Sequence, residues 1–287
     1  MTKDSWPPKP LKYSNVDELV VAGFGDEWSR FDYVTLSAQE KRDAFNSYFA
    51  IFPWSKIPAD AVGADIGCGS GRWASLVAPR VGTLHCIDAS REALDVARKA
   101  LSNQPNCQFH HAIANEIPLP DATLDFGYCL GVLHHIPDTQ SALNACVSKL
   151  KSGAPFLVYL YYRFDNRPAW FRAIWRISDG ARRLISRLPH GPRFVVSQLL
   201  AVAVYWPFAR SAWLADHLGL DVSNWPLSTY RDRSFYVLRT DSLDRFGTRL
   251  EKRFTRDEIA VMMEGAGLRE VRFHSSAPYW TAVGFKA

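Results

Sequence analysis

The 287-residue sequence predicts an α/β fold: a seven-stranded, mostly parallel sheet with helices on both faces, plus a helical cap inserted after the fifth strand. Two observations predict it. Short apolar runs alternate with segments of helical periodicity across residues 59–162, which is typical of a parallel sheet covered by helices. The alternation stops across residues 163–253 and resumes in 254–287. The sequence therefore divides into an N-terminal helical segment (1–58), a two-part core and the cap.

The individual elements follow from local patterns. Short apolar runs predict seven strands, at 62–66, 83–88, 107–112, 124–130, 156–162, 268–274 and 279–285. Helices are expected at 72–78, 90–102, 138–150 and 255–266. Ser90 is a candidate N-cap, and Thr255 with Glu258 forms a capping-box pattern. Strands and helices in this order indicate a Rossmann-like core with two additional strands at its C-terminal end.

Composition and charge narrow the function classes. The net charge is +5, but residues 163–193 alone hold eight arginines and two aspartates, a sum of +6. The five cysteines have no CxxC spacing, so we expect reduced thiols and no structural metal site. The first ten residues lack an apolar run, so no signal peptide is expected. Together these features favour a cytoplasmic protein.

A glycine-rich segment runs from Asp65 to Gly71, between the first predicted strand and the following helix. Glycines allow the backbone to turn sharply and to approach a ligand closely. Ligands of open α/β sheets bind beyond the carboxyl ends of the strands, where this loop lies. Asp88 ends the second predicted strand at the same edge, where a carboxylate can accept both hydroxyls of a nucleoside's ribose. The loop and the acid together predict a nucleoside-binding site.

The segments Asp65–Gly71, Cys86–Ser90, Ile117–Asp121 and Leu130–Asp138 resemble the successive motifs of the class I S-adenosylmethionine-dependent methyltransferases, in particular the branch that methylates ubiquinone precursors and other small molecules. The resemblance covers residues 60–160 and 254–287. It implies S-adenosylmethionine as the cofactor and a Rossmann-like fold.

The resemblance also implies roles for individual residues. The loop glycines would pass close to the methionine part of the cofactor, Asp65 would order the loop, and Asp88 would hold the ribose. Where the family often has an aspartate before the adenine-contacting alanine, this chain has Ile113, so Asn115 or the backbone would hold the adenine amino group. The full set of implied cofactor residues is Asp65, Gly67, Cys68, Gly69, Gly71, Asp88, Ala89, Ala114, Asn115 and Leu130.

Two other functions share part of this pattern. A nicotinamide-dependent oxidoreductase is expected to have GxGxxG, whereas this chain has GxGxG, and no hydride-transfer constellation follows. A non-catalytic module could keep the S-adenosylmethionine site for binding alone. The intact glycine loop and Asp88 favour an active methyltransferase, with an O, N or C atom of a small-molecule or lipid-linked molecule as acceptor.

Candidates for the chemistry follow the fourth and fifth predicted strands. An oxygen or ammonium acceptor needs a base, and His134, His135 and Tyr162 are the candidate catalytic residues. Tyr161 and Arg163 lie at the same sheet edge as candidate acceptor contacts. The alternative is that the histidines shape the loop and the tyrosines pack under the cap.

The N-terminal segment from Phe24 to Asp32 resembles one that precedes the methyltransferase domain in related bacterial enzymes. We interpret it as a lid across the cofactor. Trp28 would then cover the site or contact the acceptor, although a core position fits that residue equally well.

The cap is expected to select the acceptor, with Tyr230, Arg233 and Asp241 as candidate contacts. Three interpretations of its arginine-rich part stay open: a solvated face, a grip on an anionic acceptor, or an interfacial element that presents a lipid or isoprenoid-linked acceptor at a membrane. The apolar run Phe194–Leu214 is interrupted by polar residues and Pro207, so no membrane-spanning helix is expected. Nucleic-acid binding is not expected, because the aromatic side chains form no exposed stacking platform.

Overall fold

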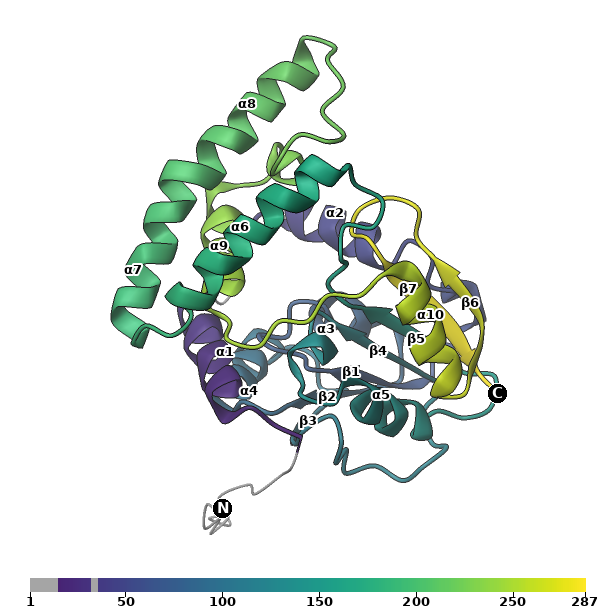
Figure 1. Ribbon diagram of the computed structural model, residues 1–287. Coiled ribbons are helices and arrows are strands. Elements are labelled where there is room, and N and C mark those ends of the chain that lie inside the picture. Colours follow the sequence, from purple (N-terminus) through teal and green to yellow (C-terminus); the bar gives the residue numbers. More distant parts are fainter. Residues whose placement is uncertain (1–14, 32–35) are drawn as a thin grey trace.

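The computed structural model describes residues 15–31 and 36–287. The residues from which the absence of a signal peptide was inferred, and Asp32 of the expected lid, lie outside these ranges. The core is a seven-stranded sheet with the strand order β3-β2-β1-β4-β5-β7-β6, and helices cover both of its faces (Figure 1). Strands β1–β5 pair in parallel, and β7 is antiparallel to both β5 and β6. The predicted Rossmann-like fold is confirmed.

All seven predicted strands form, within a few residues of their expected bounds. They are β1 (Val62–Ile66), β2 (Thr83–Asp88), β3 (Cys107–His111), β4 (Phe126–Leu130), β5 (Pro155–Tyr159), β6 (Leu268–Phe273) and β7 (Thr281–Lys286). The central strands are buried on both faces, as expected for a sheet that lies between two layers of helices. The carboxyl ends of β1, β2, β4 and β5 therefore meet at one rigid edge.

Capping signals place the core helices α4 (Arg91–Ala100), α5 (Thr139–Ser148) and α10 (Arg256–Gly265). The Ser90 hydroxyl accepts a hydrogen bond from the Ala93 amide, and Thr255 with Glu258 forms the predicted capping box. The helix after the glycine loop is shorter than predicted. It spans only Ala74–Val77 (α3) and continues as a 3-10 turn at Ala78–Arg80. Most of the difference lies at its start, because Arg72 and Trp73 still belong to the turn that leaves the glycine loop.

Helices from the N-terminal segment lie against the carboxyl edge of the sheet. These are α1 (Glu18–Arg30) and α2 (Ala38–Tyr48), followed by a 3-10 turn at Trp54–Lys56. Helix α1 packs against α4 and against the cap helix α9 (Phe235–Gly247). It therefore lies between the core and the cap, as a lid would.

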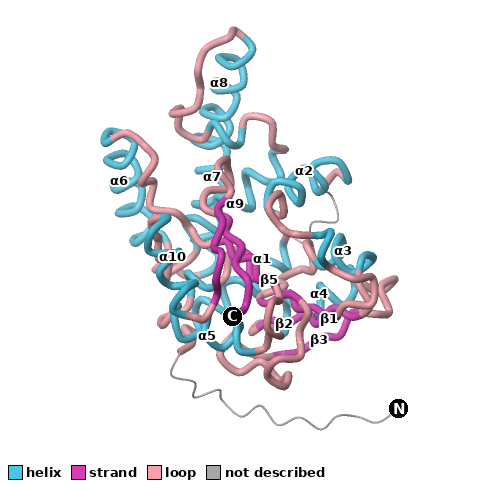
Figure 2. Tube along the Cα trace, turned by 90° about the vertical axis from the view of Figure 1, so that its right-hand side faces the viewer, coloured by secondary structure: helices cyan, strands magenta, loops and turns pink. Residues whose placement is uncertain are grey.

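The cap occupies the chain between β5 and α10 and reaches away from the sheet (Figures 1 and 2). It contains α6 (Ala169–Ile185), α7 (His190–Leu200), α8 (Trp206–His217), a 3-10 turn at Ser228–Tyr230 and α9. Helix α6 continues through Gly180 without a break. Helices α6 and α7 both pack on α9, which joins them to the core.

Pro207 does not interrupt the apolar run of the cap. A π-helical segment, Ala201–Tyr205, joins α7 to α8 directly before Pro207, and such a segment changes the hydrogen-bond register that an uninterrupted α-helix would impose on the proline. The result is one continuous helix of 28 residues, His190–His217, which is long and apolar enough to cross a membrane by length and composition. The prediction that polar residues and Pro207 leave too short an apolar run for a spanning helix is therefore contradicted, as far as length and composition go.

Candidate active site

Three glycines turn the loop after β1. Gly67, Gly69 and Gly71 have φ angles of 77°, 53° and 78°, a region that other residues rarely adopt. A Cβ atom on Gly67 would also lie 2.3 Å from the Val132 side chain. The amides of Gly67 and Cys68 donate to the carbonyl oxygen of Ile87 and bind the loop to the end of β2. The loop backbone is thus fixed and unobstructed by side chains of its own.

Asp88 lies beside this loop at the end of β2. One of its carboxylate oxygens accepts from the Gly69 amide and the other from the Ser90 amide, each at 2.8 Å. A carboxylate offers about four acceptor positions, so each oxygen keeps one for a further donor. Asp88 can therefore hold the glycine loop and accept two hydroxyl groups at the same time.

Asp65 is the buried acid just before the loop. Its side chain is 1% exposed, and its Oδ2 atom has no hydrogen-bond partner within residues 15–31 and 36–287. Burial raises the pKa of Asp65 to about 8, against the opposing effect of the Tyr128 hydroxyl on the neighbouring strand. Such an orphaned acid is costly to the fold and typical of a functional site.

Helix α1 closes over the glycine loop. A Cβ atom on Gly69 would lie 3.0 Å from the Trp28 ring, so the indole rests against the loop. Gly25 approaches the start of α4 so closely that a Cβ there would lie 2.7 Å from the Ser90 hydroxyl. Phe24 packs on the His135 ring at 4.9 Å. One helix thus covers the ends of β1, β2 and β4.

His135 has a defined tautomer. Its Nδ1 atom lies 2.6 Å from the carbonyl oxygen of Leu250, which only accepts, so Nδ1 carries the hydrogen. Burial lowers the pKa of His135 despite the nearby Asp244 carboxyl, so the ring is neutral at physiological pH. Its Nε2 lone pair has no partner in the described part of the chain. This is the electronic state of a general base.

His134 is in a different position. Its ring is completely buried, stacks on Tyr161 at 3.9 Å and contacts His135 at 4.0 Å. Burial holds its pKa well below the ordinary value. His134 therefore packs behind His135, and of the two histidines only His135 has an oriented ring.

Three carboxyl groups face this edge from α1 and α9. Glu27 comes from α1, and Asp241 and Asp244 come from one face of α9. Burial raises the pKa of all three, to about 6 for Asp241, and repulsion from Asp244 adds to the increase for Glu27 and Asp241. The Tyr161 hydroxyl donates to Asp244. We call Glu27, His135, Tyr161, Asp241 and Asp244 the acceptor cluster.

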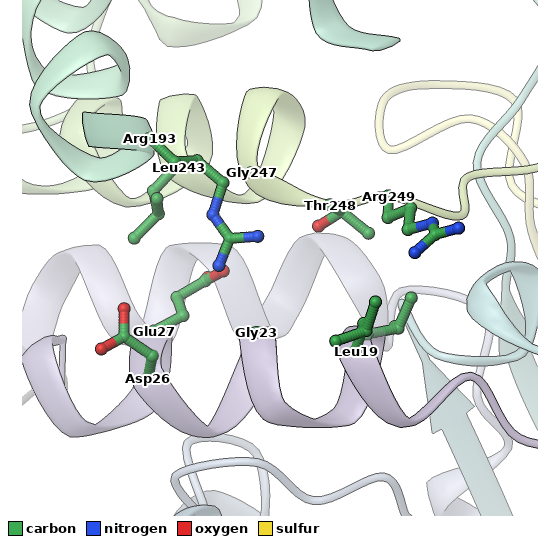
Figure 3. Close-up of a pocket in the computed structure, with 10 residues that line it drawn as sticks. Leu19, Gly23, Asp26, Glu27, Arg193, Leu243, Gly247, Thr248 and Arg249 are labelled. Carbon is green, nitrogen blue, oxygen red and sulfur yellow. The ribbon is translucent and has the colours of Figure 1, made fainter. Parts of the chain in front are cut away.

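A small pocket separates α1 from the cap beside this cluster. Figure 3 shows the Arg193 guanidinium of α7 pointing toward Glu27 of α1, with Leu243 and Gly247 of α9 alongside. The positive charge of Arg193 opposes the increase in the pKa of Glu27. The cap and the lid are therefore joined by charge as well as by packing.

Comparison with known proteins identifies the core. Residues 64–158 match the family model of a methyltransferase domain. Ubiquinone biosynthesis O-methyltransferases of Aromatoleum aromaticum and Paracidovorax citrulli are each 32% identical, over 129 and 133 residues. The chain therefore carries a class I S-adenosylmethionine-dependent methyltransferase domain.

The matches to curated relatives cover only part of each chain. Each of these two matches covers 44% of this chain and 53% and 52% of the relatives, so the chain spans about half the length of the curated relatives it matches. A methyltransferase structure from Thermotoga maritima aligns over 94% of this chain and 99% of its own, at a TM-score of 0.51 and 15% identity. That match shows a common fold, which extends through most of the chain.

S-adenosylmethionine is the cofactor of this domain, and the residues present fit it. The glycine loop would lie along its methionine part, and the open acceptor positions of Asp88 suit the two ribose hydroxyls. Near the loop, Asp65 supplies a carboxyl oxygen that has no partner in the part of the chain that the structure describes. When bound, the cofactor supplies an activated methyl group on a positively charged sulfur. The protein's own contribution is to position an acceptor and to exclude water.

The remaining predicted cofactor contacts of the methyltransferase domain differ in how far the structure supports them. The Cys68 side chain is buried in the core, so only its backbone can reach the cofactor. Ala89 follows Asp88, and Leu130 ends β4, both at the correct edge. The Asn115 amide bonds to Asn15 and Ser141. An adenine contact by Ala114 or Asn115 stays a prediction.

Two predicted residues of the acceptor side lie elsewhere. Tyr162 points away from the acceptor cluster and packs on Phe164 and Tyr279, because neighbouring residues of an extended segment face opposite sides. Exposed Arg163 pairs with Glu258 of α10 at 2.8 Å. The structure therefore does not bring Tyr162 or Arg163 into the acceptor cluster, and a catalytic role for Tyr162 and an acceptor contact by Arg163 stay predictions.

The cap residues Tyr230 and Asp241 lie together, since the Tyr230 hydroxyl bonds to the Asp241 carboxyl, and Arg233 is close enough to lower the pKa of Asp241. Their role as acceptor contacts stays a prediction. Sequence reasoning missed Asp244 and Glu27. The spacing of three residues between Asp241 and Asp244 could have indicated two carboxyls on one helical face.

The buried acid Asp65 gives a pH-dependent prediction for the cofactor-free protein. Its folded pKa of about 8 exceeds the ordinary 3.8, so the folded state holds a proton that the unfolded state releases between these values. Asp65 therefore lowers the free energy of unfolding as pH rises through that window, by at most about 1.4 kcal/mol per pH unit. Urea unfolding from pH 5 to 8 should show a flatter profile for Asp65→Asn than for the wild type. An Asp65→Asn profile as steep as that of exposed Asp95→Asn would contradict the assignment.

The position of Trp28 predicts a role in cofactor retention. Trp28→Ala removes the ring that rests on the glycine loop, so S-adenosylhomocysteine should dissociate about tenfold faster. Stopped-flow displacement measures this rate, and Trp170→Ala on the exposed side of α6 is the matched control. Equal dissociation rates for both variants would show that α1 is not a lid.

Proposed function

We propose that the protein transfers a methyl group from S-adenosylmethionine to a hydroxyl group of a small-molecule or lipid-linked acceptor held between α9 and the carboxyl edge of the sheet. Nitrogen and carbon acceptors are the less favoured alternatives. The observation that carries the proposal is the neutral His135 ring, whose Nδ1 atom donates its hydrogen to the Leu250 carbonyl and whose Nε2 lone pair has no partner among residues 15–31 and 36–287. A hydroxyl acceptor needs such a base.

The acceptor cluster supports a polar acceptor. Asp244 is close to His135 and stabilises the positive charge that the ring would gain on taking a proton. The Tyr161 hydroxyl fixes the Asp244 side chain. Tyr230, Arg233 and Asp241 add donors and acceptors from the cap, and the relatives are named for O-methylation in ubiquinone biosynthesis. These contacts favour a hydroxyl acceptor that carries further polar groups.

A binding module without catalysis is the second candidate, and the oriented base argues against it. We expect the protein to act in the cytoplasm, where the cap would select the acceptor. The test is incubation of the full chain with methyl-labelled S-adenosylmethionine and cell extract, followed by separation of aqueous and organic fractions. Label in either fraction supports an enzyme and names the acceptor class. Tight binding of S-adenosylmethionine with no labelled product in either fraction would favour the module.

A further inference from the structure

We propose that the outer face of the cap docks on an anionic membrane surface. The first observation is an unpartnered apolar stripe on the long helix His190–His217. Its members recur at spacings of four, three, four and seven residues, as on one face of a helix. They are Val195, Leu199, Val202, Trp206 and Trp213, which are 39% to 61% exposed. Only 22% of the helix's most apolar window is buried in the fold.

Helix α6 carries a second exposed apolar stripe. It consists of Trp170, Ile174, Ile177 and Leu184, with Ile177 76% exposed. Since α6 and α7 both pack on α9, the exposed residues of α6 and the α7 residues Val195 and Leu199 lie on the sides of these helices that face away from α9. Figures 1 and 2 show α6 and α8 extending from the core at the same end of the molecule. Exposed apolar area of this extent marks an interaction site.

Charge identifies the partner. From Asn166 to Ala215 the sequence holds eight arginines and a single acid, Asp179. That acid is buried and already paired with Arg182 and Arg183. The exposed guanidinium groups of Arg176 and Arg187 form no ion pair or hydrogen bond with any described residue. Apolar stripes flanked by arginines and tryptophans suit the boundary between anionic lipid headgroups and acyl chains.

The contacts on the opposite face of the long helix indicate that this helix lies on the membrane surface and does not cross the membrane. Arg193 and Ser197 are buried on this face, and the Ser197 carbonyl accepts from Ser242 of α9. Arg210 donates to the carbonyl oxygens of Arg231 and Arg233. A spanning helix would have to break these bonds and expose Arg193 to lipid, which is costly.

Vesicle co-sedimentation of the full chain tests this surface. Vesicles of phosphatidylcholine mixed equally with phosphatidylglycerol should bind the wild type at least about tenfold more tightly than phosphatidylcholine alone. Leu199→Asp with Val202→Asp should weaken binding by at least about tenfold, whereas Val261→Asp on exposed α10 should not. Arg176→Glu with Arg187→Glu should remove the preference for anionic lipid, and Arg269→Glu on β6 is its control.

The outcomes are separate from methyl transfer, because binding is measured without cofactor or acceptor. Equal, weak sedimentation with both kinds of vesicle would overturn the proposal. So would analytical ultracentrifugation showing that Leu199 and Val202 hold two copies of the chain together while vesicles do not bind. Lipid binding that persists unchanged in both double variants would also exclude this face.

Discussion

Asp88→Ala should weaken S-adenosylmethionine binding by about 100-fold or more, measured by titration calorimetry on the full chain. The carboxylate would accept both ribose hydroxyls while it holds the Gly69 amide. Hydrogen bonds to a charged acceptor contribute about 1.5–3 kcal/mol each, so the loss of two exceeds the effect of any single neutral contact. The alanine variant also releases the loop, which adds to the loss.

Asp95→Ala is the matched control for this experiment. Asp95 lies on α4 and forms an exposed pair with Arg98, so its removal should leave the affinity within about twofold. A thermal melt of Asp88→Ala separates loss of contact from loss of fold. A folded Asp88→Ala variant that binds as tightly as the wild type would mean that the ribose lies elsewhere.

His135→Asn should lower kcat for methyl transfer by about 100- to 10,000-fold, the range that a general base contributes. Asparagine can still donate to the Leu250 carbonyl but has no basic nitrogen in place of Nε2. The KM for S-adenosylmethionine should change little, because the proposed base acts on the acceptor. The rate is measured with methyl-labelled cofactor and the extract fraction that accepts label.

The pH profile distinguishes this base from a packing residue. Burial lowers the pKa of His135 below 6.5, so the wild-type rate should stay level above that pKa and fall as pH drops through it. The variant should lack this fall. His217→Asn is the control, since its Nδ1 also lies on a backbone carbonyl, at 2.9 Å from Trp213. A His135→Asn enzyme with near wild-type kcat would remove His135 from the chemistry.

Local signals were sufficient for the fold. The strand runs, the Ser90 cap and the Thr255–Glu258 capping box depend on neighbours within a few residues, and the structure confirms them. Prediction failed where one residue's effect on the helix depends on backbone detail. Pro207 is accommodated within one continuous helix because a π-helical segment precedes it. The sequence shows where the proline is, but it does not show the hydrogen-bond register of the helix at that position.

Some residues of the candidate site could likewise be predicted from local sequence patterns, whereas others could not. Gly67 and Asp88 are recognisable because the loop and the strand end need those residue types at that spacing. The choice between Tyr161 and Tyr162 depends on which face of the chain turns inward after β5, and alternation alone gives both answers. Asp244 meets Tyr161 only through packing of α9 across more than eighty residues of chain. Such long-range contacts leave no local pattern.

The most direct test of the central claim is a crystal structure of the protein grown with S-adenosylhomocysteine. We expect the nucleoside at the ends of β1 and β2, with both ribose hydroxyls on Asp88 and Trp28 over the glycine loop. A structure with the ligand bound outside this loop, or with no ligand at saturating concentration, would contradict the account.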